Sequence, residues 1–395
     1  MKPQPPDPQR LAARMADIAP FHVMELLQRA RALQAAGRSI ITLCVGEPDF
    51  PTPQPMLDAA IAFLHGGDVH YTPALGLPQL REAIAGYYAS RFGLDIPASR
   101  IVVTAGASAA MLLVLGVLTD PGDRWLLPDP GYPCNRHFVR LLEGVPVALS
   151  VDEASDFQAT AGRVAEAWDE ATRGLIVATP SNPTGTVLDA PALGDLCRTV
   201  AGLGGHLVVD EIYQGLNYDC TAHTALALDS EAFVINSFSK YFGMTGWRLG
   251  WLVAPPGYVR AIEKLAQNLY ICAPTPAQHA ALAAFRPDTL QLLEQRRAEF
   301  AARRDFLRPA LQSLGFGLPG NPRGAFYLYA DVSTLCDDSY AFAHELLDHC
   351  GVAVTPGLDF GANSCRRFVR VAYSRDTGQL EQAVQRMAAF ISHSR

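Results

Sequence analysis

The chain has 395 residues, of which 49% are hydrophobic and 18% are charged, a composition typical of a globular protein with more than one hydrophobic core. The formal net charge is −7 and the arginines are scattered along the chain, so the charge pattern argues against nucleic acid as a partner. The first ten residues are polar and proline-rich, without the apolar stretch of a secretory signal. We therefore expect a flexible arm and a cytoplasmic protein.

The cysteines and the longest uncharged stretch argue against three further classes: disulfide-rich, metal-binding and membrane proteins. The eight cysteines are widely spaced, with no Cys-x-x-Cys pair and no His/Cys cluster, which predicts reduced thiols and no metal site. Residues 101–119 lack charge over a length that could span a membrane, but Thr104, Gly106 and Ser108 interrupt them. This stretch favours a strand, a turn and a buried helix, with no membrane segment.

The N-terminal region predicts a helix followed by a short strand. Apolar residues recur at helical spacing over Met15–Ala36, and Gly37 is a typical helix end. The apolar run Ile40–Gly46 predicts a strand that leads into a proline-rich loop. Gly46 has no Cβ, so a ligand could approach its backbone closely.

From residue 101 the pattern changes to short β-rich runs that alternate with helical segments. The runs are apolar on both faces, which is typical of a mostly parallel sheet with helices on both sides. Seven runs follow one another: IVVT from 101, RWLLP from 124, VPVALS from 145, GLIVAT from 174, HLVVDE from 206, AFVINSF from 232 and RLGWLVA from 248. Beyond residue 256 the chain predicts helices and then a small α+β unit.

We therefore predict an α/β protein with a large domain built on a mostly parallel seven-stranded sheet and a smaller α+β domain. The predicted divisions are residues 1–46, an arm and helix that pack with the small domain; residues 47–285, the large domain; and residues 286–395, the small domain. Ligands of parallel sheets bind at the carboxyl ends of the strands. That rule selects Gly106, Ala107, Ser108, Tyr132, Asn182, Asp210, Tyr213 and Lys240 as candidates.

Each candidate also has an ordinary structural explanation, so only the set indicates a site. Backbone N–H groups after Gly106, at a helix start, favour a phosphate, which Ser237 and Arg248 could also bind. Lys240 could form a Schiff base with a carbonyl if burial and a nearby cation such as Arg248 lower its pKa. The alternative for Lys240 alone is a solvated side chain.

The remaining candidates suit a flat, charged ring and a carboxylate. Asp210 ends an apolar run, where a carboxylate requires a positive partner such as a protonated ring nitrogen. Asn182 and Tyr213 could bond a phenolate oxygen, and Tyr132 could stack on the ring. Arg370 lies mid-strand among apolar residues and needs an anion, either a substrate carboxylate or an internal Asp or Glu.

Six motifs then occur in order along the chain. They are GEPDF from 46, YTPALGLPQLR from 71, PSNPTG from 180, DEIYQG from 210, SFSKYFGMTGWRLG from 237 and GAFY from 324. Together they resemble the signatures of the class I and II aminotransferases, fold type I enzymes that use pyridoxal 5'-phosphate, and the resemblance runs from about Phe21 to Ser394. The lysine motif is the most specific of the six.

The resemblance implies roles around the cofactor ring. Lys240 would hold the cofactor as a Schiff base and then move a proton between the amino acid and the cofactor. Asp210 would keep the ring nitrogen protonated, Tyr213 and Asn182 would bond the phenolate oxygen, and Tyr132 would stack on the ring. Catalytic roles are thus expected for Lys240, Asp210 and Tyr213.

The resemblance also implies a phosphate site and a dimer. The backbones of Ala107 and Ser108, with Ser237 and Arg248, would hold the phosphate, although the family commonly has Gly-Gly or Ser-Gly where this chain has Gly106-Ala107. Tyr71 matches a tyrosine that reaches the phosphate from the neighbouring subunit. A homodimer with shared active sites is therefore expected.

For the substrate, the resemblance implies that Arg370 binds the α-carboxylate, with Gly46 and Asn182 beside it. No second arginine can be assigned to a distal carboxylate, and Arg323, just before GAFY, has no assignable role. The implied activity is amino-group transfer between an amino acid and a 2-oxo acid by a ping-pong route. The alternatives are a β-lyase on the same fold and, more remotely, a cofactor-sensing regulator, which would need an added DNA-binding domain.

Overall fold

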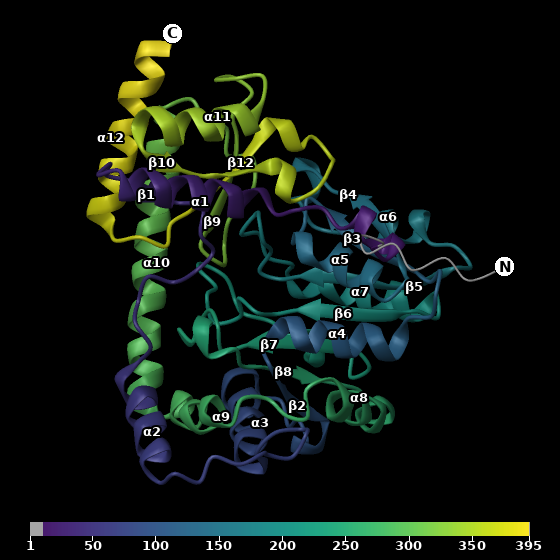
Figure 1. Ribbon diagram of the computed structural model, residues 1–395. Coiled ribbons are helices and arrows are strands. Elements are labelled where there is room, and N and C mark those ends of the chain that lie inside the picture. Colours follow the sequence, from purple (N-terminus) through teal and green to yellow (C-terminus); the bar gives the residue numbers. More distant parts are fainter. Residues whose placement is uncertain (1–10, 395) are drawn as a thin grey trace, which may run out of the picture.

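The computed structural model describes residues 11–394 and is organised around a seven-stranded sheet (Figure 1). The strands are β2 Ile101–Thr104, β3 Arg124–Asp129, β4 Val145–Ser150, β5 Thr172–Ala178, β6 His206–Asp210, β7 Phe233–Ser237 and β8 Gly250–Val253. Their order is β2-β8-β7-β6-β5-β3-β4, and all neighbours are parallel except that β8 runs antiparallel to both β2 and β7. The predicted seven-stranded, mostly parallel sheet is confirmed, and each strand lies where the sequence places it.

Both faces of this sheet are covered because alternate side chains of each strand point in opposite directions. In β6, Val208 belongs to one hydrophobic core, whereas Leu207 and Val209 belong to the other. The first core is covered by α4 Ala107–Leu118, α5 Pro133–Leu141 and α8 Pro256–Leu269. The second is covered by α3 Pro78–Phe92 and α7 Ala190–Gly202, with α6 Ala161–Ala167 beside α7.

The C-terminal part of the chain forms a second, antiparallel sheet of three strands. Its strands, in spatial order, are β11 Thr355–Pro356, β12 Phe368–Ala372 and β9 Tyr327–Asp331. It is accompanied by α11 Ser339–Glu345 and α12 Thr377–Ser394. The long helix α10 Pro287–Ser313 runs from the neighbourhood of α2 Gln54–His65 and α9 Thr275–Ala281 up to α12 (Figure 1).

The predicted helix Met15–Ala36 is wrong in its first part. The structure has a short 3-10 helix, Ala13–Asp17, then an irregular segment, and only then α1 His22–Ala35. The segment contains Pro20, whose ring fixes φ and removes a backbone donor, so a continuous helix cannot form there. The end of the helix is as predicted, because Gly37 follows it with a φ of +87°.

The predicted strand Ile40–Gly46 is shorter than expected. Only β1 Ile41–Thr42 is a strand, paired in parallel with β10 Val352–Ala353. Leu43 still donates its N–H to the carbonyl of Ala353 at 2.8 Å, after which the chain leaves the pairing. This early departure brings Gly46 to the functional site described below.

Three further expectations concern the chain as a whole. The predicted arm, residues 1–10, lies outside the described residues. Among residues 11–394, none of the helices combines the length and the apolar character that a bilayer crossing requires. The predicted divisions at residues 46 and 285 stay a prediction, although α1 does contact the C-terminal part, since the N–H groups of His22 and Val23 donate to the carboxylate of Asp359 at 2.8 and 2.9 Å.

Candidate active site

A cavity of about 380 Å³ opens where the central strands end. Most of the residues that the sequence selected, although they come from distant segments of the chain, line this cavity. The predicted site residues that line it are Gly46, Ala107, Ser108, Tyr132, Asn182, Asp210, Tyr213, Lys240, Arg248 and Arg370. The carboxyl ends of parallel strands meet at one edge of a sheet, which explains why the strand-end residues converge.

Three predicted residues, Gly106, Tyr71 and Ser237, are not among those that line this cavity. Tyr71 lies in the loop before α3 and is 79% exposed. Ser237 is buried, and its hydroxyl lies 3.1 Å from the carbonyl oxygen of Leu249 and accepts the N–H of Ser239 at 3.0 Å. Ser239 is the serine of the lysine motif that faces the cavity.

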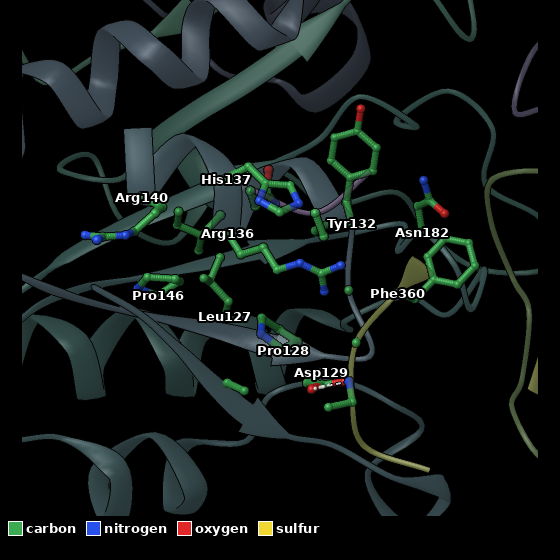
Figure 2. Close-up of a pocket in the computed structure, with 18 of the residues that line it drawn as sticks. Leu127, Pro128, Asp129, Tyr132, Arg136, His137, Arg140, Pro146, Asn182 and Phe360 are labelled. Atoms are coloured by element: carbon green, nitrogen blue, oxygen red, sulfur yellow. Dashed lines mark hydrogen bonds between the residues drawn. The ribbon is translucent and has the colours of Figure 1, made fainter. Parts of the chain in front are cut away.

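A second and larger cavity, of about 760 Å³, adjoins the first. The two share Tyr132, Asn135, Ala178 and Asn182 in their walls. Figure 2 shows this larger cavity between α5, the ends of β3 and the segment around Phe360, with the side chain of Arg136 extended across it. Nothing in the sequence pattern indicated this second space.

Lys240 lies at the centre of the smaller cavity. Its Nζ donates to the carbonyl oxygen of Gly46 at 2.6 Å. Burial lowers the pKa of Lys240 to about 8; the Glu47 carboxylate acts against this, whereas the charges of Arg370 and Arg248 lower it further. The lowered pKa increases the fraction of the amine that is neutral, and so nucleophilic, close to neutral pH.

Asp210 ends β6 with its carboxylate buried at the cavity floor. Its Oδ1 accepts the N–H of Ile212 at 3.1 Å, and none of the described cations forms an ion pair with it. Burial raises the pKa of Asp210 to about 6, although the Ile212 hydrogen bond and the charge of Lys240 act in the opposite direction. A cationic group on a ligand would offset the free-energy cost of burying this carboxylate.

An anion site lies at the N-terminus of α4. Gly106 precedes the helix with a φ of +83°, a conformation that favours glycine, and a Cβ there would lie 2.7 Å from an Nη atom of Arg248, so the guanidinium would have to move. The guanidinium of Arg248 thus sits beside the free N–H groups of Ala107 and Ser108. Helix dipole, backbone donors and a guanidinium together favour a phosphate.

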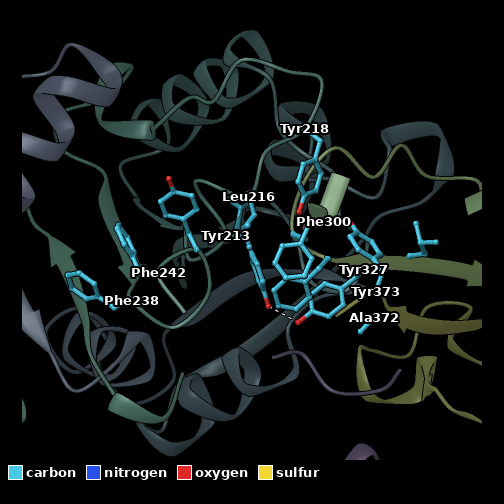
Figure 3. Close-up of a cluster of buried hydrophobic side chains, with 14 of the residues drawn as sticks. Tyr213, Leu216, Tyr218, Phe238, Phe242, Phe300, Tyr327, Ala372 and Tyr373 are labelled. Carbon is cyan, nitrogen blue, oxygen red and sulfur yellow. Dashed lines mark hydrogen bonds between the residues drawn. The ribbon is translucent and has the colours of Figure 1, made fainter. Parts of the chain in front are cut away.

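A pair of tyrosine hydroxyls forms one wall of the cavity. The hydroxyl oxygens of Tyr213 and Tyr327 are 2.8 Å apart and hydrogen-bonded (Figure 3). Burial raises the pKa of both, so both hydroxyls stay protonated and one of them can donate to a ligand. A Cβ on Gly46 would come within 2.2 Å of the Tyr327 hydroxyl oxygen, so the close approach requires glycine at 46. Sequence reasoning gave Tyr327 no role, although it is the last residue of the GAFY motif.

Arg370 comes from the other sheet, in the middle of β12. Its two Nη atoms donate to Oδ1 of Asn182 and to the carbonyl of Cys44, each at 2.8 Å. The guanidinium lies 4.3 Å from the Tyr327 ring centroid and 4.8 Å from that of Phe360. It is buried, its Nε has no partner, and none of the described carboxylates lies within 4.0 Å of it, so the alternative of an internal Asp or Glu partner does not hold.

The cavity wall formed by α1 and the segment before it is apolar. Phe21, Val23, Met24 and Leu27 line it. Their helical spacing predicted an apolar face but could not show what that face contacts. Arg323 lines neither cavity; its Nη2 lies 3.5 Å from the carbonyl of Val187.

The donor set of the smaller cavity fits pyridoxal phosphate. Lys240 is a buried amine of lowered pKa, the α4 N-terminus and Arg248 form an anion site, and Asp210 is a buried carboxylate without a cation. These three groups match the aldehyde, the phosphate and the ring nitrogen of that cofactor.

Comparison with known proteins agrees with the site. Residues 38–387 match the family model described as aminotransferase class I and II. The valine–pyruvate aminotransferase of Mycobacterium tuberculosis is 38% identical over 97% of this chain and 98% of its own length. An aspartate aminotransferase of Geobacillus stearothermophilus is 34% identical over 97% of this chain and 99% of its own length. The crystal structure of an aminotransferase from Mycobacterium tuberculosis is similar with a TM-score of 0.94 and 38% identity, covering 98% of this chain and 100% of that one. The chain therefore belongs to the class I and II aminotransferases, enzymes of fold type I that depend on pyridoxal phosphate.

Proposed function

We propose that this protein moves an amino group between an amino acid and a 2-oxo acid by a ping-pong route, with the residues of the smaller cavity in the roles set out below. The observation that carries the proposal is the meeting of three groups in one cavity. Lys240 is an amine of lowered pKa, Asp210 is a buried carboxylate without a cation, and Arg370 is a buried guanidinium without a carboxylate.

We assign the cofactor-binding roles from the position of each residue in or beside the smaller cavity. Arg248 and the N–H groups of Ala107 and Ser108 bind the phosphate, with Ser237 or the cavity-facing Ser239 as a further hydroxyl. Tyr132 packs against the ring.

Asn182 accepts from Arg370 through Oδ1, which leaves its NH₂ group as a donor. That group and the hydroxyl of Tyr213 are directed to the phenolate oxygen of the ring. Asp210 holds a proton on the ring nitrogen.

Bound pyridoxal phosphate supplies an aldehyde for the amino group and a ring that accepts the electron pair released at the substrate's Cα. Lys240 would take the Cα proton on its neutral Nζ and pass it to the bound cofactor, which leaves the amine neutral again. Arg370 binds the substrate's α-carboxylate, and the tyrosine and phenylalanine rings on either side of it keep water away from the pair. Gly46 leaves the room that this arrangement needs.

A spectral titration tests the proposal. The purified holoprotein should show the absorption band of the bound cofactor, an amino donor alone should shift it stoichiometrically, and a 2-oxo acid should restore it. Release of pyruvate and ammonia from cysteine conjugates, with no oxo-acid acceptor needed, would instead favour the β-lyase. An unchanged band with every donor tried would contradict both activities.

We further propose a homodimer in which Tyr71 completes the phosphate site of the neighbouring subunit. Support comes from the 79% exposure of Tyr71 and its distance from the cavity of its own chain, which leave its hydroxyl unused there. Tyr71→Phe should weaken cofactor retention. Co-expression with Lys240→Ala subunits should restore it at one site of each mixed dimer, because that site then has both Lys240 and a partner tyrosine. A monomer in analytical ultracentrifugation would contradict the proposal.

A further inference from the structure

Tyr241, the residue after Lys240, ties the lysine turn to the long helix α10. It is 4% exposed, and its hydroxyl donates to Oε1 of Glu294 at 2.7 Å. Burial raises the pKa of Tyr241, and the hydrogen bond to Glu294 raises it further, so the hydroxyl stays a donor. The turn is therefore attached to α10 one residue away from the amine of Lys240.

Two arginines hold Glu294 in turn. Nη1 of Arg91, on α3, donates to Oε1 at 3.0 Å, and Nε of Arg297, one turn along α10, donates to Oε2 at 2.6 Å. Burial acts to raise the pKa of Glu294, but the hydrogen bonds from Tyr241 and the two arginines leave that pKa below its usual value. The carboxylate therefore stays ionised at neutral pH and keeps accepting from Tyr241.

The ring of Tyr241 also packs against the segment that carries Tyr213. A Cβ on Gly215 would come within 2.4 Å of this ring, so the ring lies directly on the backbone of that segment. Arg297 adds a second attachment, because its Nη1 donates to the carbonyl of Asn217 at 3.2 Å. The segment after Tyr213 is thus held by the same ring and the same helix.

Helix α10 also holds the segment that accepts the hydrogen bond of Lys240. Nζ of Lys240 donates to the carbonyl of Gly46 at 2.6 Å. Three residues beyond Gly46, Asp49 accepts from Nη1 of Arg303 at 2.7 Å, and the Arg303 side chain is 1% exposed. Separating a buried ion pair leaves an uncompensated charge, so this attachment resists displacement. Both partners of the contact between Lys240 and Gly46 are therefore fastened to one helix.

The far end of the lysine turn has an attachment of its own. Thr52 Oγ1 donates to the carbonyl of Gly243 at 3.1 Å and accepts the indole N–H of Trp247 at 3.0 Å. Loss of the Tyr241 hydroxyl would therefore loosen the end of the turn next to Lys240 while the other end stays in place.

We propose that Glu294 is a positioning residue for Lys240. Through the hydroxyl of Tyr241 it holds the lysine turn against α10, which keeps Nζ beside the Gly46 carbonyl. The inference rests on the role proposed for Lys240 in transamination. Neither Glu294 nor Tyr241 is among the residues that line the smaller cavity, so both act through the turn and not by touching substrate or cofactor.

The apoprotein offers a measurement that does not depend on turnover. Acetylation of Lys240 by acetic anhydride, followed across pH by mass spectrometry, should have a midpoint near pH 8 in the wild type. In Tyr241→Phe the turn is released from Glu294, so Nζ reaches water more often and its charged form is favoured. The midpoint should rise by about 0.5 to 1 pH unit, toward that of an ordinary lysine.

The holoenzyme should show a loss that falls on kcat. In Tyr241→Phe, kcat should decrease about 5- to 50-fold, because the amine is no longer held in one place for proton transfer. The KM of the amino donor should change less than about threefold, since the residues proposed to bind the substrate are untouched.

A double-mutant cycle decides whether Glu294 acts through Tyr241. Glu294→Ala should raise the acetylation midpoint at least as far as Tyr241→Phe, and Glu294→Gln, which keeps an acceptor for the hydroxyl, should raise it less. Adding Tyr241→Phe to Glu294→Ala should then cause no further change. Loss of the negative charge alone would act in the opposite direction, because one anion fewer favours the neutral amine.

Tyr88→Phe is the matched control for a merely structural effect. Tyr88 is fully buried, and its hydroxyl oxygen accepts the indole N–H of Trp251 at 3.2 Å, away from the lysine turn. This variant also removes one buried hydroxyl, so its Tm should fall as in Tyr241→Phe. Its acetylation midpoint and its kcat should equal those of the wild type.

The outcomes separate the inference from the proposed function. An unchanged midpoint in Tyr241→Phe would overturn the inference, and so would an equal shift in Tyr88→Phe. Additive shifts in the double variant would show that Glu294 does not act through Tyr241. If no amino donor shifts the cofactor band of the wild type, the proposed function fails, while the midpoints of the apoproteins still decide whether Glu294 positions Lys240.

Discussion

Replacing Lys240 by alanine is expected to lower kcat by at least about 10⁴-fold, because one side chain both binds the cofactor and carries the proton. The fall in kcat is measured from steady-state transamination in a coupled assay. The matched control is Lys264→Ala, which removes an exposed lysine of α8 and should leave kcat unchanged. A Lys240→Ala enzyme that keeps its cofactor band and turnover would show that the mechanism is wrong.

The lysine content of the chain makes the identity of this residue directly measurable. The sequence has three lysines, Lys2, Lys240 and Lys264. Borohydride reduction of the holoprotein should fix the cofactor on the peptide that contains Lys240.

In the apoprotein, acetylation of Lys240 by acetic anhydride should rise with a midpoint near pH 8. The buried amine, with its pKa of about 8, loses its proton there, whereas acetylation of the exposed Lys264 should keep rising well above that pH. A midpoint for Lys240 near that of an ordinary lysine would contradict the desolvated site.

Asp210→Asn is expected to cost about 10²- to 10³-fold in kcat, since an amide cannot hold a proton on the ring nitrogen through charge. The change keeps the size of the side chain, and Oδ1 can still accept from Ile212, so the fold should be preserved. The sign of the pKa shift fits this role. Burial raises the pKa of Asp210 to about 6, so the carboxylate is destabilised until a cation reaches it.

The measurement for Asp210 separates binding from chemistry. The Asp210→Asn holoprotein should still retain the cofactor, because the phosphate site at the start of α4 is untouched, while its turnover should be lost. Asp210→Glu keeps the charge and should recover part of the activity. Turnover equal to that of the wild type in Asp210→Asn would remove Asp210 from the catalytic residues.

The sequence alone was enough to predict the central sheet and most of the selected residues that line the smaller cavity. Short runs that are apolar on both faces are typical of buried strands, and the strand-end rule then selected Asp210, Asn182 and Lys240 without any contact information. Where the prediction was wrong, local chemistry explains it. Pro20 stops the first helix early, and the strand after Ile40 ends after two residues because the backbone turns toward Gly46.

The missed residues share a physical cause. Tyr327 acts through its contact with Tyr213, 114 residues away in sequence. Helical spacing likewise marked Met24 and Leu27 as apolar without showing that they line a cavity. Periodicity describes one element at a time, whereas these roles depend on pairs of elements.

The origin of the two groups of residues has a consequence for how this enzyme can diversify. The groups proposed for the cofactor come from the ends of the seven-stranded sheet, whose strands are locked by their neighbours. The apolar wall of the same cavity comes from α1 and the segment before it, which lie outside that sheet. Substitutions on this wall can therefore change the shape of the cavity without moving the strand ends, a separation that suits both natural divergence and laboratory evolution of new amine products.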